Sequence, residues 1–362
     1  MEKMKVGVLG GTGMVGQHYI ERLENHPWFK VVSISASPRS AGKTYENAVK
    51  HKWQMPIPIP ESLRDVIVRD VQDYDSIPSD LDFVFSAVNM PTKDQIREVE
   101  FKYANLGVPV VSNNSAHRWT KDVPMIIGEI NHHHSEVIPI QQKNRGFEKG
   151  FVTVKPNCSL QSYLTAIYAL EEAGYKVEKL IITTLQAVSG AGYPGVPSLD
   201  MVDNIVPYIG GEEKKTEKEP LKILGKVGED GIVNNDSIKI SSTCTRVAVV
   251  HGHTASVNMK FKDEIPAREE IIEIWRNFKA LPQELELPFA PKHPIIYLEN
   301  EDRPQPRKDR DNGKGMAVTV GRLRKDNVFD YKFVSLSHNI IRGAAGGAIL
   351  NAELLKHKGI LE

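Results

Sequence analysis

The stretch Met4-Lys5-Val6-Gly7-Val8-Leu9-Gly10-Gly11-Thr12-Gly13-Met14-Val15-Gly16 decides the fold of this chain. An apolar run, a glycine-rich turn and a helical pattern that extends to about Glu24 predict a strand, a turn and a helix. Gly10, Gly13 and Gly16 are spaced so that the backbone can turn tightly, approach a pyrophosphate and pack the helix on the strand. Because a second strand is expected at 31–37, we predict a doubly wound parallel sheet that binds a dinucleotide.

The residues after the second strand indicate which dinucleotide binds. An NAD site usually places Asp or Glu at this point to hold the ribose hydroxyls. This chain instead has Ser37-Pro38-Arg39-Ser40. The hydroxyls of Ser37 and Ser40 and the guanidinium of Arg39 suit a 2′-phosphate, which favours NADP over NAD. A polar turn with an exposed arginine is the alternative.

Later segments continue the parallel sheet. Residues 82–88 read as a buried strand, 93–105 as a helix and 108–112 as the next strand. The polar residues at the carboxyl ends of these strands are Ser86, Asn89, Asn113, Asn114 and Ser115. Since ligands bind outside the carboxyl ends of parallel strands, we expect all of these residues to face the ligand crevice.

The sequence changes character after about residue 150, which predicts a second domain. Residues 159–172 have a helical pattern, whereas 179–187 and 244–258 alternate as half-buried antiparallel strands do. The charged segments 212–231 and 299–314 are expected to be solvated loops or helix faces.

The tail, residues 339–356, is a predicted helix of small residues suited to close packing. We expect it to return to the first domain and to complete the cofactor wall. The predicted cofactor domain is therefore residues 1–155 together with 338–362. Residues 156–337 are the predicted catalytic and dimerisation domain.

The composition limits the classes of partner. Lys plus Arg and Asp plus Glu both number 46, so no basic field indicates nucleic acid or an anionic membrane. Neither an apolar run of about 18 residues nor a signal-peptide pattern is present, which predicts a cytoplasmic protein. The only cysteines, Cys158 and Cys244, would both be thiols in a reducing compartment. The expected partners are small molecules and the protein's own subunits.

Cys158 is the candidate nucleophile. It follows Pro156-Asn157 and precedes a helical pattern, so its sulfur is expected near free backbone amides and the positive end of a helix dipole. Such a position favours a thiolate, and the amides could hold an oxyanion. A buried, inert cysteine is the alternative that this segment alone leaves open.

Arg246 and His253 are the candidate partners of the cysteine. Their odd separation requires a bend if both are to face one site, and Gly252 can provide it. His253 would then act as general acid and base and Arg246 would bind a carboxylate. A purely structural histidine is the alternative. The run His132-His133-His134 lacks partners at metal-ligand spacing, so no metal is expected.

In combination, the motifs resemble the aspartate-semialdehyde dehydrogenase family, most closely its archaeal and fungal branch. The matching segments run from end to end of the chain and are 10–16, 36–43, 112–118, Pro156-Asn157-Cys158-Ser159, 186–195, 211–215, 243–246, 252–254, 303–307 and 342–347. The resemblance implies a second domain of the glyceraldehyde-3-phosphate dehydrogenase type, with an α+β fold, and a homodimer or homotetramer.

The resemblance also implies individual roles. Cys158 matches the nucleophile, Gln186 the amide that orients the substrate and His253 the acid-base. Arg246 matches the residue that binds the substrate carboxylate, and Glu212 matches the residue that meets the substrate ammonium. Glu213 is a neighbouring alternative to Glu212, and Lys214 is one to Lys215. The implied phosphate cluster is Arg118, Asn157 and Lys215. The implied cofactor contacts are Thr12, Gly13, Met14, Val15, Ser37, Arg39, Ser40, Ser189, Gly190 and Asn339.

The implied reaction is the NADPH-dependent reduction of aspartyl phosphate to aspartate semialdehyde through a thioester on Cys158, which feeds lysine, methionine and threonine synthesis. Forming a thioester splits one hard reduction into two easier steps. One alternative is malonyl-CoA reductase, which resembles this family and shares the cysteine chemistry. Glu212 and Lys215 favour the amino-acid substrate, since malonyl-CoA lacks the ammonium. A non-catalytic NADP-binding sensor is the more remote alternative.

Overall fold

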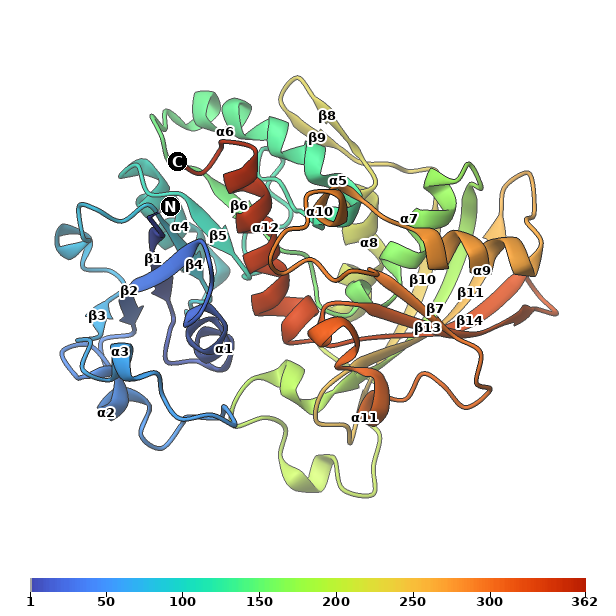
Figure 1. Cartoon of the computed structure of the whole chain (residues 1–362), viewed down its shortest axis with the longest axis horizontal. Helices are drawn as coiled ribbons and strands as arrows, with labels where there is room; N and C mark the ends of the chain where they lie inside the picture. Colours follow the sequence, from blue (N-terminus) through green and yellow to red (C-terminus); the bar gives the residue numbers. More distant parts are fainter. Residues whose placement is uncertain (1) are drawn as a thin grey trace.

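A parallel sheet forms the amino-terminal part of the computed structural model, which describes residues 2–362 (Figure 1). Its strands are β1 (Met4–Leu9), β2 (Phe29–Ala36), β3 (Arg69–Asp70), β4 (Phe83–Ser86), β5 (Val110–Ser112) and β6 (Val152–Val154). They lie in the order β3-β2-β1-β4-β5-β6. Because β1 pairs in parallel with both β2 and β4, the order reverses there and opens a ligand crevice at the carboxyl ends of these strands. The predicted doubly wound sheet is confirmed.

The helices of this part follow the glycine turn and the later strands. They are α1 (Met14–Leu23), α2 (Tyr45–Val49), α3 (Glu61–Arg64), α4 (Lys93–Asn105), α5 (Gly128–Asn131) and α6 (Ile138–Arg145). α4 has the bounds that the sequence predicts. It begins there because Thr92 and Gln95 form a reciprocal capping box.

A second, mixed sheet forms the carboxyl-terminal part. Its strands are β7 (Val177–Ala187), β10 (Lys239–Val247), β11 (His253–Phe261), β12 (Ile295–Leu298), β13 (Val318–Lys325) and β14 (Tyr331–Ser337), in the order β10-β7-β11-β14-β13-β12. The expectation of an antiparallel domain is correct for β7-β11-β14-β13, but β7 pairs in parallel with β10 and β12 with β13. α7 (Leu164–Glu172) and α9 (Arg268–Asn277) cover one face of this sheet.

The parallel pairing of β7 and β10 follows from the long connection between them. This crossover contains α8 (Glu212–Ile223) and the hairpin of β8 (Lys226–Gly228) and β9 (Gly231–Val233). Parallel neighbours require such a crossover. The charged segment 212–231 is therefore largely a helix with a buried polar face. Segment 299–314 is mostly loop around α11 (Pro306–Asp309), and α10 (Leu281–Glu284) precedes β12.

The tail returns to the first domain, as predicted. A π-helical turn, Ile341–Ala345, leads into α12 (Gly346–His357), which lies between the two sheets in Figure 1. Ala348 and Ile349 on α12 join the core of the first sheet, whereas Leu350 and Leu354 pack with Leu287. α12 is thus buried from several sides.

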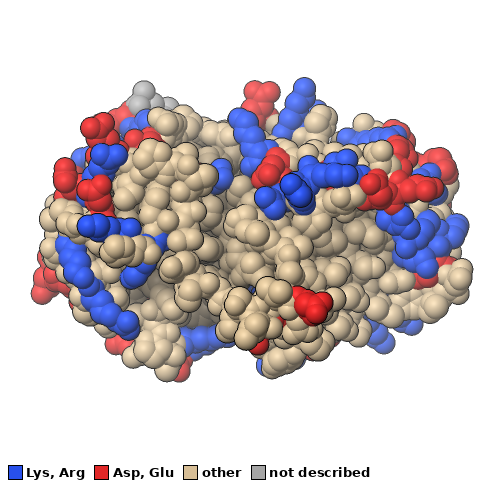
Figure 2. All heavy atoms as spheres, turned by 90° about the horizontal axis from the view of Figure 1, so that it is seen from below, with Lys and Arg blue, Asp and Glu red and all other residues tan. Residues whose placement is uncertain are grey.

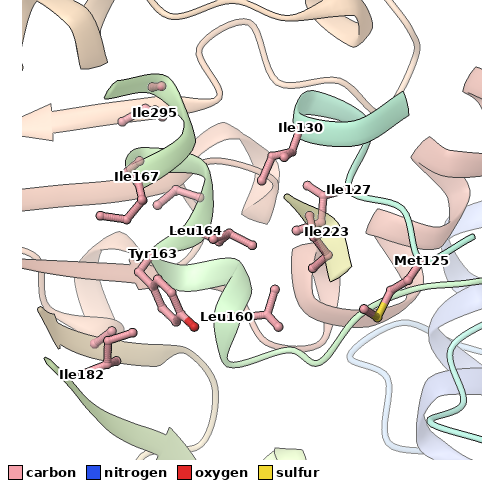
Figure 3. Close-up of a cluster of buried hydrophobic side chains, with 14 of the residues drawn as sticks. Met125, Ile127, Ile130, Leu160, Tyr163, Leu164, Ile167, Ile182, Ile223 and Ile295 are labelled. Carbon is pink, nitrogen blue, oxygen red and sulfur yellow. The ribbon is translucent and has the colours of Figure 1, made fainter. Parts of the chain in front are cut away.

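One apolar core continues across both parts of the chain. Figure 3 shows Ile127 and Ile130 from the first domain beside Leu160 and Leu164, and Ile182 of the second sheet belongs to the same cluster. This continuity restricts movement at the segment that carries Cys158.

On the face drawn in Figure 2, Lys and Arg lie close to Asp and Glu at both ends of the molecule, and the middle is largely uncharged. Among residues 2–362, no helix has the length and apolar character needed to span a bilayer.

Candidate active site

The glycine turn between β1 and α1 has the shape that a dinucleotide pyrophosphate requires. Gly10 has a φ of 78°, and a Cβ there would overlap the carbonyl of Ala87. A Cβ on Gly16 would overlap the Gly10 carbonyl, so α1 packs directly on the turn. Gly13 precedes α1 without a side-chain cap, which leaves the first helix amides for an anion. The turn fits a dinucleotide.

A cavity of about 500 Å³ opens beside this turn and is lined by both domains. Its lining residues are Gly13, Met14, Val15, Ala87, Val88, Asn89, Asn113, Asn114, Ser115, Arg118, Asn157, Cys158, Ser189, Gly190, Ala191, Gly192, Tyr193, Glu212, Lys215, Asn339, Ile340, Gly343 and Ala344. The cavity therefore joins the glycine turn, the polar residues after β4 and β5, and Cys158 in one space.

Ser86 does not face this crevice, so that prediction is wrong. Its side chain is fully buried at the end of β4, and its Oγ donates a 2.7 Å hydrogen bond to Glu100 Oε1. Ser37 and Arg39 are exposed at the end of β2, and Ser40 is buried beside them. These three residues lie outside the lining of the cavity, and their role as 2′-phosphate contacts stays a prediction.

Cys158 and His253 are in contact. Cys158 Sγ lies 3.3 Å from His253 Nε2. The Ala187 N–H donates a 3.0 Å hydrogen bond to His253 Nδ1. Because Nδ1 accepts this bond, we infer that the neutral imidazole carries its proton on Nε2, facing the sulfur. His253 is thus placed to donate a hydrogen bond to a thiolate or to an oxyanion.

The protein environment keeps this pair neutral. Burial, aided by the Glu212 carboxylate, raises the pKa of the Cys158 thiol to about 11. Burial, aided by the positive charge of Arg246, lowers the pKa of His253 to about 3. The expectation of a thiolate favoured by a helix terminus is wrong, because a 3₁₀ turn at Leu160–Ser162 follows the cysteine and α7 begins only at Leu164.

Glu212 organises the polar side of the site from the start of α8. Its carboxylate accepts hydrogen bonds from Asn157 Nδ2 at 3.0 Å and from Gln186 Nε2 at 3.2 Å, and it pairs with Lys215. Burial alone would raise the pKa of Glu212, but the charge of Lys215 and these hydrogen bonds hold that pKa below its ordinary value. The carboxylate is therefore ionised beside the crevice.

Arg118 is held by a second buried carboxylate of α8. Its Nη1 lies 3.1 Å from Glu219 Oε1, and its Nε donates to the carbonyl of Lys155 at 3.0 Å. The other oxygen of Glu219 accepts the Asn157 N–H at 2.6 Å. Lys222 Nζ, also on α8, donates to three carbonyls of the segment that carries Arg118, those of Arg118, Thr120 and Val123.

The helical register of α8 determines which residues of 212–215 reach the cavity. Glu212 and Lys215 line the cavity, whereas Lys214 is exposed and Glu213 accepts the Cys244 N–H outside it. Sequence reasoning missed Glu219. The signal was available, because positions 212, 215 and 219 lie on one face of a helix.

The predicted bend before His253 is present. Gly252 has a φ of 102°, and its N–H donates to Asn339 Oδ1 at 2.8 Å. Arg246 is buried, and its Nη1 donates to the Ala187 carbonyl at 2.8 Å. A Cβ on Gly190 would lie 3.0 Å from Arg246 Nη1 and 3.2 Å from His253 Cε1. Gly190 thus brings the crevice wall directly against both side chains.

The three adjacent histidines lie elsewhere. His134 is buried and hydrogen-bonded to Asn131 and to the Gly225 carbonyl. Within residues 2–362 no group of three or more His, Cys, Asp or Glu side chains could hold a metal ion.

Two family models match the chain. One is described as semialdehyde dehydrogenase, NAD binding domain, over residues 5–138. The other is semialdehyde dehydrogenase, dimerisation domain, over residues 167–342. Together with the dinucleotide turn and the cysteine–histidine pair, these matches define a dehydrogenase of the semialdehyde dehydrogenase class.

Individual relatives identify the family. The aspartate-semialdehyde dehydrogenase of Archaeoglobus fulgidus is 44% identical to this chain, over 99% of this chain and 100% of the relative. That of Aspergillus fumigatus is 42% identical, over 99% of each. The crystal structure of aspartate semialdehyde dehydrogenase with NADP from Candida albicans matches with a TM-score of 0.89 and 38% identity, over 99% of this chain and 100% of that one. The chain belongs to the aspartate-semialdehyde dehydrogenase family.

Glu219→Gln tests the role of the buried carboxylate. The change leaves Arg118 buried without a full negative partner, so we expect the free energy of unfolding to fall by about 3 kcal/mol, measured by urea titration. Lys214→Gln, at an exposed position of the same helix, is the control and should change that energy by less than about 0.5 kcal/mol. Equal stability of the two variants would contradict the assigned role of Glu219.

Proposed function

We propose that this chain is an NADP-dependent aspartate-semialdehyde dehydrogenase, which reduces L-aspartyl 4-phosphate to L-aspartate 4-semialdehyde and phosphate. The observation that carries the proposal is the 3.3 Å contact of Cys158 Sγ with His253 Nε2 beside a cavity that also reaches the dinucleotide turn. The names of the full-length relatives support it. The product would feed lysine, methionine and threonine synthesis.

The residues of this chain fit the cofactor. The turn at Gly10 to Val15 would hold the pyrophosphate, and Ser37, Arg39 and Ser40 would meet the 2′-phosphate. Ser189, Gly190 and Asn339 form the opposite wall, where Asn339 Nδ2 donates to Ser189 Oγ at 2.9 Å. NADPH, when bound, supplies the hydride for the reduction.

The charges of the site complement those of aspartyl phosphate. Arg118, Lys215 and the amide of Asn157 would bind the phosphate, and Arg246 the α-carboxylate. Glu212, which is ionised, would meet the ammonium. The proposed substrate carries two kinds of anion and one cation, and the site offers partners for each.

The chemistry requires Cys158 to react as a thiolate, after its thiol proton has passed to solvent in the crevice. Its sulfur attacks the acyl carbon, the carbon–oxygen bond to phosphate breaks, and phosphate leaves with the bonding electrons. The Nε2–H of His253 donates to the carbonyl oxygen as negative charge develops on it. After reduction, the carbon–sulfur bond breaks and returns the thiolate.

A free thiol needs a reducing compartment, so we also propose a cytoplasmic location.

The decisive assay is the phosphate-dependent oxidation of aspartate semialdehyde with NADP. We expect Cys158→Ala to lower turnover by at least about 10⁴-fold while the Kd for NADP changes by less than about twofold. Cys244→Ala is the matched control, since this buried thiol does not line the cavity.

Three outcomes of this assay would contradict the proposal. CoA-dependent oxidation of malonate semialdehyde in place of the expected reaction would indicate a malonyl-CoA reductase. NADP binding with neither turnover nor a thioester adduct would indicate a sensor. Turnover at the parent rate by Cys158→Ala would exclude the nucleophile.

Arg39→Ala tests the choice of cofactor. Loss of a charge-assisted hydrogen bond to the 2′-phosphate should lower the NADP-to-NAD ratio of kcat/KM by about 10- to 100-fold. Lys30→Ala, which removes an exposed charge at the other end of β2, should leave the ratio unchanged. If Arg39→Ala retains the parent ratio, the 2′-phosphate is bound elsewhere.

We also propose that the protein forms at least a homodimer through the second domain. Ile181 on the β7 strand is 44% exposed, and the segment before α8 exposes Leu199, Val202 and Tyr208 at 88%, 68% and 66%. Large exposed apolar side chains grouped in one segment are typical of an interface. Sedimentation equilibrium should give a dimer or tetramer for the parent and a smaller species for Leu199→Asp with Val202→Asp. A parent monomer at all concentrations would exclude the interface.

A further inference from the structure

Lys155, three residues before Cys158, is a buried lysine without a protein hydrogen-bond partner. Its side chain is 2% exposed, and its Nζ makes no hydrogen bond to any atom of the described residues. The other fully enclosed lysine near the site, Lys222, donates to three carbonyls. Burying an ammonium is costly unless it is paired, so an unpartnered one beside a nucleophile requires an explanation.

The Lys155 side chain lines a small cavity. The cavity measures about 10 Å³, close to the space of one water molecule, and Glu129, Gln161 and Arg342 also line it. Gln161 Nε2 and Arg342 Nε are likewise without protein partners, and Arg342 Nη1 pairs with Glu129 at 2.9 Å. The only carboxylate of the cavity, Glu129, is therefore already paired with Arg342, and Lys155 has no hydrogen-bonded carboxylate of its own.

The tail packs against both Cys158 and Lys155. A Cβ on Gly343 would lie 2.8 Å from Cys158 Cβ, and one on Gly347 would overlap Lys155 Cε. Gly343 and Gly347 are one helical turn apart, which corresponds to roughly 6 Å along the axis. The same two glycines thus seat the nucleophile and the buried ammonium on one face of the tail, which explains why this segment needs glycine at both positions.

We propose that Lys155 is a positioning residue whose buried ammonium stabilises the thiolate of Cys158. The neutral His253 donates a hydrogen bond to the sulfur but supplies no positive charge. Arg118 and Lys215 are already paired with carboxylates of α8. The charged and titratable groups that act on Cys158 are Arg118, Lys155, Glu212, Lys215, Arg246 and His253. The inference rests on the proposed role of Cys158 as the nucleophile.

The electrostatics of the two groups are reciprocal. Burial lowers the pKa of Lys155 to about 7, and negative charge on Cys158 acts in the opposite direction. The charges of Arg118 and Lys215, and after them that of Lys155, in turn favour ionisation of the thiol. Formation of the thiolate therefore strengthens proton binding at Lys155, so that the ion pair forms together.

The test is the pH dependence of Cys158 alkylation by iodoacetamide, which needs no substrate or cofactor. In Lys155→Met the alkylation rate at about pH 6, where Lys155 of the parent carries its proton, should fall about 10- to 100-fold, and above about pH 8 the two rates should converge. Lys155→Gln restores hydrogen bonding but not charge, and should show the same fall at low pH. Gln161→Met, a neutral change in the same cavity, is the control and should keep the parent rate.

An alkylation rate at about pH 6 that is unchanged in folded Lys155→Met, or that is restored in Lys155→Gln, would overturn the inference and leave Lys155 a packing role. If neither variant folds, the Lys155 amine is titrated by NMR in the parent chain alkylated at Cys158. A carboxymethyl adduct, which is negative, must raise the Lys155 midpoint relative to a neutral carbamidomethyl adduct; equal midpoints overturn the inference. If the phosphate-dependent assay fails but alkylation of Cys158 still depends on Lys155, the proposed function is rejected and the role of Lys155 is not.

Discussion

The pairing of buried cations with Glu212 and Glu219 is the constraint on which the site depends. Burying a guanidinium or an ammonium is costly unless a carboxylate compensates its charge. Because the two glutamates are on one face of α8, this helix fixes Arg118, Lys215 and Asn157 at once. The position of α8 is in turn set by the crossover between β7 and β10.

This arrangement makes the site a property of both domains. The glycine turn and Arg118 lie in the domain of the parallel sheet. His253 lies in the mixed sheet, and Glu212 lies in the crossover between its strands β7 and β10. The terminal helix joins them, because Gly343 allows its backbone to approach Cys158. A continuous core beneath this junction keeps the cysteine, the histidine and the glycine turn in a fixed relation.

The sequence predicted those features of the structure that a few adjacent residues determine. The glycine turn, the bounds of α4 and the bend at Gly252 could all be derived from the sequence, because each depends on a few adjacent residues. Ser86 could not be placed, since its direction depends on the buried Glu100 that it meets in space. The ionisation of Cys158 depends on burial and on charges from several distant segments, which a helix-start pattern does not contain.

The charge balance of the site connects these observations. Arg118, Lys155, Lys215 and Arg246 act on Cys158, whereas Glu212 and Glu219 are the carboxylates bonded to Asn157 beside it. The cations outnumber the carboxylates, but burial still holds the free cysteine as a thiol. The surplus of positive charge in the site favours the binding of anions, and the proposed substrate carries a phosphate and a carboxylate. The same surplus then favours the thiolate and the developing oxyanion, so substrate recognition and nucleophile activation share one electrostatic origin.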